Sequence, residues 1–419
     1  MYFIRNKYLN ELIAGRGNGL VKIITGVRRC GKSFLLFKIW HNWLLEHGVE
    51  ANHIIEIQLD DFRNRKLRKP DTLLDYIDSK IVDDGNTNYV VLDEVQLVEE
   101  FVEVILSLTH MRNVDVYVSG SNSRFLSSDV VTEFRGRGDE IRVWPLTFDE
   151  YFNGMGGDIR KAWLDYYTFG GLPQVALLEN EEKKIDYLKR MYETTYLRDI
   201  IERNGLRNVD GMRELVRVMA STIGSSTNPT RIANTFQSAQ GISIKRDTIK
   251  QYIDYMKDSF LIEEALRYDV KGRKYIGTET KYYFADMGIR AAVLNYRQQE
   301  ETHIMENIIY NELRSRGYSV DVGMVEHRTP SERKQLEVDF VVNRPPYRVY
   351  IQSAFHMPTP EKEQQERRSL LAIDDHFKKI VIVGDDIHRK EDEYGVLTIG
   401  LLDFLTDKDL LEKETLQHK

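Results

Sequence analysis

A glycine-rich loop near the start of the chain limits what the N-terminal part can fold into. The apolar run VKIIT leads directly into the pattern GxxxxGK[ST], and the helix-compatible run FLLFKIW follows it. A strand, such a turn and a helix in this order typically bind phosphate, because backbone N–H groups and the helix N-terminus point at its oxygens. The loop therefore predicts a parallel α/β sheet that binds a nucleoside triphosphate. The expected nucleotide-binding residues are Gly26, Val27, Arg28, Arg29, Cys30, Gly31, Lys32, Ser33 and the following Phe34.

A second motif supplies the acidic residues that a triphosphatase needs. The apolar run NYVVL ends in Asp93 and Glu94. We expect Lys32 to bridge the β and γ phosphates, and Ser33 and Asp93 to hold Mg²⁺. Glu94 is then the residue that orients or deprotonates the attacking water. The two motifs together predict ATP and Mg²⁺ as ligands, with hydrolysis to ADP and phosphate.

Strand and helix patterns alternate over residues 1–144, which indicates βαβ units and a parallel sheet. The run 53–59 falls between the two nucleotide motifs, so the strand before Asp93 need not adjoin the strand before the loop. Together with Glu94, this favours the division of P-loop proteins that has an inserted strand and a catalytic glutamate, and disfavours a small-molecule kinase. The expected strands are 20–25, 53–59, 88–92, 115–119 and 139–143.

Two further segments of this part suit contacts with the γ-phosphate. Ser121 or Asn122, which follow the fourth expected strand, are the candidate polar sensor; the alternative is a plain turn. Arg135 and Arg137, in the run FRGRG, are candidate arginine fingers that act on a nucleotide held by a neighbouring subunit. A finger of this kind would imply a homo-oligomer. Solvated loop arginines are the alternative.

Composition restricts the remaining choices. A chain of 419 residues exceeds what one core usually serves, so several domains are expected. The net charge of −7 argues against a surface coated in positive charge for nucleic acid, so such a contact must be local. A single cysteine, Cys30, excludes an internal disulfide. No apolar run reaches the roughly 18 residues of a membrane span, which favours a cytoplasmic protein without membrane contact.

The order of the motifs resembles a prokaryotic family of AAA-type ATPases whose members carry a C-terminal domain of unknown function. The matching runs are, in this order, GVRRCGKS, VVLDEVQ, SGSNS, FRGRG, WPLTFDEY, FGGLP and YLRDI, and the resemblance spans nearly the whole chain. In related signalling ATPases a Gly-x-Pro element of the lid contacts adenine. The resemblance implies that role for Gly171 and Pro173; the competing interpretation is a helix break.

The middle of the chain indicates a helical lid followed by a winged helix. From residue 145 to about 223 the strand signal stops and apolar residues recur at helical spacing. Residues 224–295 then show helix-turn-helix punctuation and two strands around a basic turn. Residues 207–274 hold twelve basic and eight acidic residues, a local positive excess that suits DNA. In ATPases the same module often packs only against the lid or a protein partner. The candidate DNA contacts are Lys245, Arg246, Lys250, Lys271, Arg273 and Lys274.

The order of elements over residues 296–419 resembles the restriction-endonuclease-like fold. In that fold a helix glutamate, a strand aspartate and an acid-x-lysine on the next strand gather a divalent metal. Here Glu306 and Asp339 fill the first two places, but Gln352 and Ala354 stand where acid-x-lysine belongs. We therefore expect a degenerate nuclease site with weak metal binding, no cleavage, and Glu306 and Asp339 kept as a polar pair.

The sequence as a whole predicts a Mg²⁺-dependent ATP-hydrolysing switch or motor that acts on double-stranded DNA through its C-terminal half. One alternative is a regulatory ATPase that controls protein assembly without touching DNA. Another is an ATP-gated nuclease. The expected domains are a P-loop ATPase core over 1–144, a helical lid over 145–223, a winged helix over 224–295 and an inactive restriction-endonuclease-like domain over 296–419.

Overall fold

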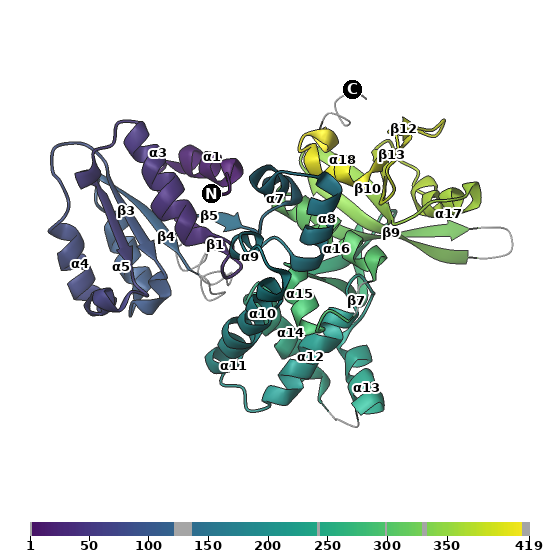
Figure 1. Cartoon of the computed structure of the whole chain (residues 1–419), viewed down its shortest axis with the longest axis horizontal. Helices are drawn as coiled ribbons and strands as arrows, with labels where there is room; N and C mark the ends of the chain where they lie inside the picture. The colour runs from purple at the N-terminus through teal and green to yellow at the C-terminus, as the bar shows by residue number, and fades with distance from the viewer. Residues whose placement is uncertain (1, 121–135, 241–243, 298–299, 329–332, 413–419) are drawn as a thin grey trace. The chain divides into compact units, whose positions relative to one another are not determined.

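The computed structural model describes residues 2–120, 136–240, 244–297, 300–328 and 333–412 (Figure 1). The chain divides into two compact units. The N-terminal unit comprises Met1–Pro145, Leu172–Gln174 and Asp258–Phe260. The C-terminal unit comprises Leu146–Gly171, Val175–Lys257 and Leu261–Lys419. In the described parts of both units, no helix combines the length and the apolar character that a membrane crossing requires.

The N-terminal unit is built on a five-stranded parallel sheet. All five expected strands are confirmed, and each bound differs from the prediction by at most one residue. The order across the sheet is β2-β3-β4-β1-β5. The strands are β1 (Val21–Gly26), β2 (Ile54–Gln58), β3 (Asn88–Asp93), β4 (Val114–Ser119) and β5 (Gly138–Val143).

The strand that precedes Asp93 does not adjoin the strand that precedes the loop, as predicted. The strand between them, however, is β4, which comes after β3 in the chain. The sequence attributed this separation to the run 53–59, but that run forms the edge strand β2. Chain order does not determine spatial order in a parallel sheet, because a crossover connection can skip a strand.

Helices cover both faces of this sheet. On one face Val90 and Leu92 of β3 share a buried cluster with Leu73 of α4 and Ile105 of α5. On the other face the ring of Trp40 lies 5.1 Å from the ring of Tyr117 on β4. The helical segments are α1 (Asn6–Gly15), α2 (Lys32–Phe34), the π-helical η1 (Leu35–Trp40), α3 (His41–Glu46), η2 (Ala51–His53), η3 (Phe62–Arg68), α4 (Pro70–Asp78), η4 (Val95–Leu97) and α5 (Phe101–Thr109).

Residues 145–223, which the sequence predicts to be helical, form helices and no strand, and the structure describes all of them. The first helix begins with a capping box in which the Thr147 side chain accepts from the backbone of Glu150 and the Glu150 side chain accepts from that of Thr147. The helices are α7 (Phe148–Met155), α8 (Ile159–Phe169), α9 (Pro173–Ala176), α10 (Glu181–Met191), the π-helical η6 (Tyr192–Leu197), α11 (Arg198–Asn204) and α12 (Val209–Ser221).

The rest of the C-terminal unit surrounds a mixed sheet of order β12-β13-β11-β10-β9-β8-β6-β7. After the helical segment the chain continues with α13 (Pro229–Gln240), α14 (Arg246–Asp258), β6 (Ile262–Asp269), β7 (Lys274–Phe284) and α15 (Met287–Val293). They are followed by α16 (Glu301–Ser315), β8 (Ser319–Arg328), β9 (Arg333–Arg344), β10 (Tyr347–Ala354), α17 (Pro360–Leu371), β11 (Lys378–Val383), β12 (Lys390–Glu391), β13 (Val396–Gly400) and α18 (Leu401–Thr406).

The hairpin that the sequence assigns to a wing belongs to this sheet. β6 pairs with β7 antiparallel and with β8 in parallel, so that Arg267 lies opposite Val322. The segments 224–295 and 296–419, which the sequence analysis separates, therefore share one continuous sheet. The sequence predicted two separate domains over these residues, without a shared sheet.

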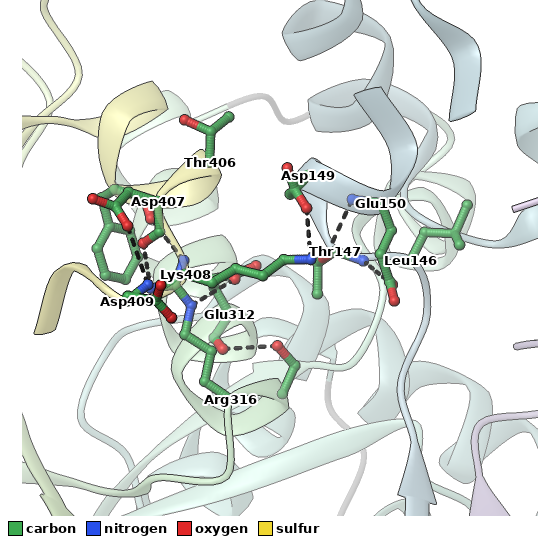
Figure 2. Close-up of polar contacts among 12 residues, drawn as sticks. Leu146, Thr147, Asp149, Glu150, Glu312, Arg316, Thr406, Asp407, Lys408 and Asp409 are labelled. Atoms are coloured by element: carbon green, nitrogen blue, oxygen red, sulfur yellow. Dashed lines mark hydrogen bonds and ion pairs between the residues drawn. The ribbon is translucent and has the colours of Figure 1, made fainter. Parts of the chain in front are cut away.

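An ion pair ties α7 to the segment after α18 within the C-terminal unit, and neighbouring hydrogen bonds tie α18 to α16 (Figure 2). Lys408 Nζ lies 2.7 Å from Asp149 Oδ2 on α7. Beside this pair, Arg316 Nε donates to the buried Glu312 at 2.8 Å, and Arg316 Nη2 donates to the carbonyl of Phe404 at 2.7 Å. The helical segment is thereby attached to the module built on the mixed sheet.

Candidate functional site

The glycine-rich loop that follows β1 packs closely against β5. Gly26 has φ 130°, and a Cβ at this position would lie 2.0 Å from the carbonyl oxygen of Val143, so only glycine fits. Gly31 has φ 101° and is the N-cap residue of α2. The thiol of the buried Cys30 contacts the Val143 carbonyl at 3.3 Å, which fixes the loop to the end of the sheet. Val27 is also buried, Arg28 is half-buried, and Arg29 is exposed with φ 66°.

The ammonium of Lys32 lies within the curve of this loop. Its Nζ donates to the carbonyl of Gly26 at 2.9 Å and to the carbonyl of Val27 at 3.1 Å, and the residue is only 6% exposed. α2, η1 and α3 follow one another without a break, so a helical stretch starts at Lys32. The positive end of this stretch and the ammonium therefore face the same loop.

Two predicted magnesium ligands lie in contact where β3 ends. The buried carboxylate of Asp93 accepts hydrogen bonds from the side chains of Ser33 and Ser119. Burial raises the pKa of Asp93, and these two hydrogen bonds oppose the rise without cancelling it. Residues distant in the sequence, from the loop, β3 and β4, thus converge on one carboxylate.

Glu94 directly follows Asp93 and is held in a defined orientation. It adopts a left-handed backbone conformation with φ 54° and is half-buried. The side-chain amide of Gln96 donates to Glu94 Oε2. Gln96 was not predicted as a site residue, although it lies within the run VVLDEVQ that carried the family resemblance.

Arg5 is a second residue that the sequence analysis missed. It is buried, and its guanidinium donates to the carbonyl of Cys30 at 3.0 Å and to the carbonyl of Trp144 at 2.7 Å. The same group stacks over Tyr8, 4.6 Å from the ring centroid. Arg5 thereby joins the segment before α1 to the glycine-rich loop and to the end of β5. A single arginine in a short N-terminal segment carries no sequence signal for this role.

Aromatic and proline side chains lie beside the loop. Tyr2 is 62% exposed and Phe34 is 43% exposed, and their ring centroids are 6.0 Å apart. Pro173 belongs to the N-terminal unit, and a Cβ built on Gly31 would lie 3.8 Å from its Cγ. Pro173 therefore borders the glycine-rich loop, as the expected adenine contact requires.

Gly171, the other half of the predicted Gly-x-Pro element, has its contacts within the C-terminal unit. Its N–H donates to the buried carboxylate of Asp286 at 2.7 Å, and its carbonyl accepts from Leu146 at 2.7 Å. A Cβ at Gly171 would lie 2.3 Å from the Leu146 carbonyl oxygen, so packing demands glycine here. Burial raises the pKa of Asp286 to about 6.

The predicted γ-phosphate contacts are only partly described. Ser121, Asn122 and Arg135 lie outside the described residues. Arg137 precedes β5, and its carbonyl accepts from Val21 N at 2.8 Å, at the end of β1 opposite to the loop. Five residues of strand, about 17 Å, separate this end from the loop. Arg137 therefore does not reach the loop of its own chain, and its side chain contacts His110 at 3.1 Å.

The six predicted DNA contacts are all exposed. Three lie at or near the start of α14, two lie in the turn between β6 and β7, and Lys274 is the first residue of β7. The Lys271 ammonium donates to the carbonyl of Glu326 at 3.1 Å, so that one corner of the turn is fixed to β8. The residues are Lys245, Arg246, Lys250, Lys271, Arg273 and Lys274.

The three predicted residues of the degenerate nuclease site lie close together. Glu306 on α16 and Asp339 on β9 both face the ammonium of Lys281 on β7, at 2.9 Å and 3.8 Å. The side-chain oxygen of Gln352 accepts from Asp339 N at 3.4 Å. The sequence predicts the pair of acids but not the lysine between them. Within the described ranges, no group of histidine, cysteine or acidic side chains has the arrangement of a metal site.

Comparisons with known proteins agree with the motifs of the N-terminal unit. An AAA domain model matches residues 18–152, and a model described as a domain of unknown function (DUF8612) matches residues 160–300. An uncharacterized protein of Haemophilus influenzae is 30% identical over 406 residues, which cover 96% of this chain and 98% of the relative. The chain belongs to a family of AAA-type P-loop ATPases. The resemblance stated from the motifs is thereby confirmed.

Other proteins are similar to this AAA-type ATPase at lower identity. An uncharacterized protein of Methanocaldococcus jannaschii is 26% identical over 338 residues, which cover 77% of this chain and 72% of the relative. Among solved structures, a Walker-type ATPase of Pyrococcus abyssi aligns with a TM-score of 0.46 and 16% identity, covering 70% of this chain and 96% of that one.

Proposed function

We propose that this AAA-type ATPase binds ATP with Mg²⁺ at the loop after β1 and hydrolyses it. The observation that carries the proposal is the convergence of Ser33 and Ser119 on the Asp93 carboxylate, together with the Lys32 ammonium, which lies within the glycine-rich loop. A hydroxyl and a carboxylate are the oxygen ligands that Mg²⁺ prefers, and the ammonium suits the β and γ phosphates. Bound Mg²⁺ would neutralise phosphate charge during transfer to water.

Glu94 is the proposed residue that orients or deprotonates the attacking water. It follows Asp93 in the chain and is half-buried, and its charge helps to raise the pKa of Asp93, so the two carboxylates lie near each other. The hydrogen bond from Gln96 fixes the direction of the carboxylate. Asn122 or Ser121 remains the proposed sensor, and Arg135 or Arg137 the proposed finger toward a neighbouring copy in a homo-oligomer.

The base of the nucleotide has a proposed place at Pro173. Its ring borders Gly31, and the exposed rings of Tyr2 and Phe34 lie on the same unit and offer apolar surface next to the first turn after the loop. Gly171 enters the proposal only as the residue that fixes the start of this segment through Asp286.

DNA is the proposed partner of the C-terminal half, in a cytoplasmic setting. The support is the exposure of six basic side chains at the start of α14 and in the β6–β7 turn, where long cations suit phosphate contacts. The alternative is a regulatory ATPase whose helical segment and hairpin contact a protein partner instead. An ATP-gated nuclease is disfavoured, because Gln352 and Ala354 replace the acid and lysine of the restriction-endonuclease-like pattern.

Steady-state hydrolysis with ATP and Mg²⁺ tests the proposal. The parent should release phosphate, Lys32→Ala should lose nucleotide affinity, and Glu94→Gln should bind ATP but turn over at least about a hundredfold more slowly. Hydrolysis by Glu94→Gln at the parental rate would refute its assigned role. Stimulation by double-stranded DNA at low salt would support the DNA-directed form, and nucleotide-dependent oligomerisation without a DNA effect would favour the regulatory form.

A further inference from the structure

An exposed aromatic ring lies among basic side chains shortly after β2. Phe62, the first residue of η3, is 70% exposed, the largest exposed fraction of any large hydrophobic side chain that the structure describes. The guanidinium carbon of Arg65 lies over its ring, 4.4 Å from the centroid. Because Phe62 is this exposed with the cation in place, its ring still presents an open face to solvent. An open ring beside cations is the arrangement on which proteins stack unpaired bases.

The segment that carries this ring has a charge opposite to that of the whole chain. Residues 62–69 contain five basic and no acidic residues, whereas the net charge of the chain is −7. Arg63 forms an ion pair with the neighbouring Asp61. Lys66 and Lys69 are exposed, and neither forms an ion pair with an acid in the described part of the chain. Two ammonium groups are therefore available to phosphates.

Contacts with the end of β2 and with the core hold the segment in place. The side-chain amide of Asn64 donates to the carbonyl of Gln58 at 2.9 Å, and Arg68 Nε donates to the carbonyl of Leu59 at 2.8 Å. Leu67 packs against the apolar cluster that the sheet shares with α4 and α5. The ring and the ammonium groups thus extend from a fixed backbone, which lowers the entropy lost when a ligand binds.

The segment begins at the same edge of the sheet as the proposed magnesium ligand. β2 pairs in parallel with β3 so that Gln58 lies opposite Asp93, and Leu59 N donates to the carbonyl of Asp93 at 3.1 Å. Phe62 follows Leu59 closely in the chain and belongs to the N-terminal unit. The basic residues of α14 and of the β6–β7 hairpin belong to the other unit, so this is a separate surface.

We propose that Phe62, Arg65, Lys66 and Lys69 form a surface that binds single-stranded DNA, with one base stacked on the Phe62 ring and the adjacent phosphates contacted by the cations. A single strand fits this surface better than a duplex, because the bases of a duplex stack on one another and present no open face. The exposed side chains of residues 62–69 are a ring and cations, so none accepts a hydrogen bond from the 2′-hydroxyl that distinguishes RNA. This inference goes beyond the proposed function, which places double-stranded DNA on the C-terminal half.

Fluorescence anisotropy with a labelled oligo-dT tests the inference on the full chain, at low salt and without nucleotide. Phe62→Ala should bind the oligonucleotide about tenfold more weakly than the parent, because the stacking of one base is lost. Phe62→Trp, which keeps a stacking face, should bind as tightly as the parent. Lys66→Ala combined with Lys69→Ala should make the slope of log affinity against log salt shallower by about 1.4, since each phosphate contact of a single strand contributes about 0.7. Tyr394→Ala is the matched control: Tyr394 is 66% exposed on the C-terminal unit, so its loss should leave binding unchanged.

Several results would overturn the inference. Oligo-dT binding that is absent in the folded parent, or equal in Phe62→Ala and the parent, contradicts it, and so does an unchanged salt slope in the double lysine variant. An equal loss by Phe62→Ala on duplex DNA would also contradict it, since stacking on the ring requires an unpaired base. Tighter binding of oligo-rU than of oligo-dT would exclude DNA as the assigned partner.

Two controls separate this surface from other effects. The loss in Phe62→Ala should persist when Lys271→Ala, Arg273→Ala and Lys274→Ala are also present; a loss that disappears there would place the strand on the C-terminal unit and contradict the inference. Urea denaturation of Phe62→Ala should match that of the parent, because the side chain is exposed, so weaker binding would not reflect a loss of fold.

Discussion

Replacing Arg5 by methionine should weaken both the fold of the N-terminal unit and its nucleotide affinity. Methionine keeps much of the apolar stem but leaves the carbonyls of Cys30 and Trp144 without the donors at 3.0 Å and 2.7 Å. Hydrogen bonds to charged groups contribute about 1.5–3 kcal/mol each. Taking the lower value for both bonds, the free energy of unfolding should fall by about 3 kcal/mol.

Urea denaturation of Arg5→Met, followed by near-ultraviolet circular dichroism, measures this loss. Because Cys30 belongs to the glycine-rich loop, the same variant should bind ATP at least tenfold more weakly in a calorimetric titration. Lys7→Met is the matched control, since Lys7 is exposed and its contact with Glu11 at 3.6 Å is a surface ion pair worth less than about 1 kcal/mol. If Arg5→Met loses no more stability than Lys7→Met and binds ATP equally well, Arg5 does not hold the loop.

Three further predictions concern Gln96, Asp286 and the basic residues of the β6–β7 hairpin. Gln96→Ala should lower kcat about tenfold with little change in KM, because Glu94 loses the donor that orients it; unchanged kcat in a steady-state assay would contradict this. Burial raises the pKa of the Asp286 carboxyl from 3.8 to about 6, so this group binds more protons in the folded state than in the unfolded state. The free energy of unfolding should therefore fall by up to about 3 kcal/mol as the pH rises from about 4 to about 6. Asp286→Asn should remove that part of the pH dependence in urea denaturation, and an unaltered profile would show that another group causes it. DNA binding in a low-salt anisotropy assay should fall, with a shallower salt dependence, when alanine replaces Lys271, Arg273 and Lys274.

The sequence predicted the parts of the fold and site that are local or follow from parallel-strand geometry. The strand before Asp93 was found from an apolar run, and its carboxyl end had to lie near the loop because parallel strands end at the same edge of a sheet. The contact between Ser33 and Asp93 follows from that geometry. The sequence also indicated that the loop after β1 needs glycine for its phosphate-binding curve, but not that Gly26 packs against the Val143 carbonyl.

The features that were missed arise from pairings across long stretches of chain. Arg5 donates to carbonyls 25 and 139 residues away in the chain, and the residues around Arg5 give no sign of either contact. β4 separates β1 from β3 although it comes later in the chain. Lys281 lay in a segment interpreted as part of a wing, and only the pairing of β6 with β8 shows that this hairpin belongs to the sheet that carries Asp339. No local periodicity encodes such contacts.

Calorimetric titration of ATP with Mg²⁺ into the full chain tests the central claim most directly. The account predicts saturable binding of one nucleotide per chain, lost in Lys32→Ala and weakened in Asp93→Asn when Mg²⁺ is present. Binding that is absent in the folded parent, or that is unaffected by Lys32→Ala, would contradict the assignment of the loop after β1 as the ATP site.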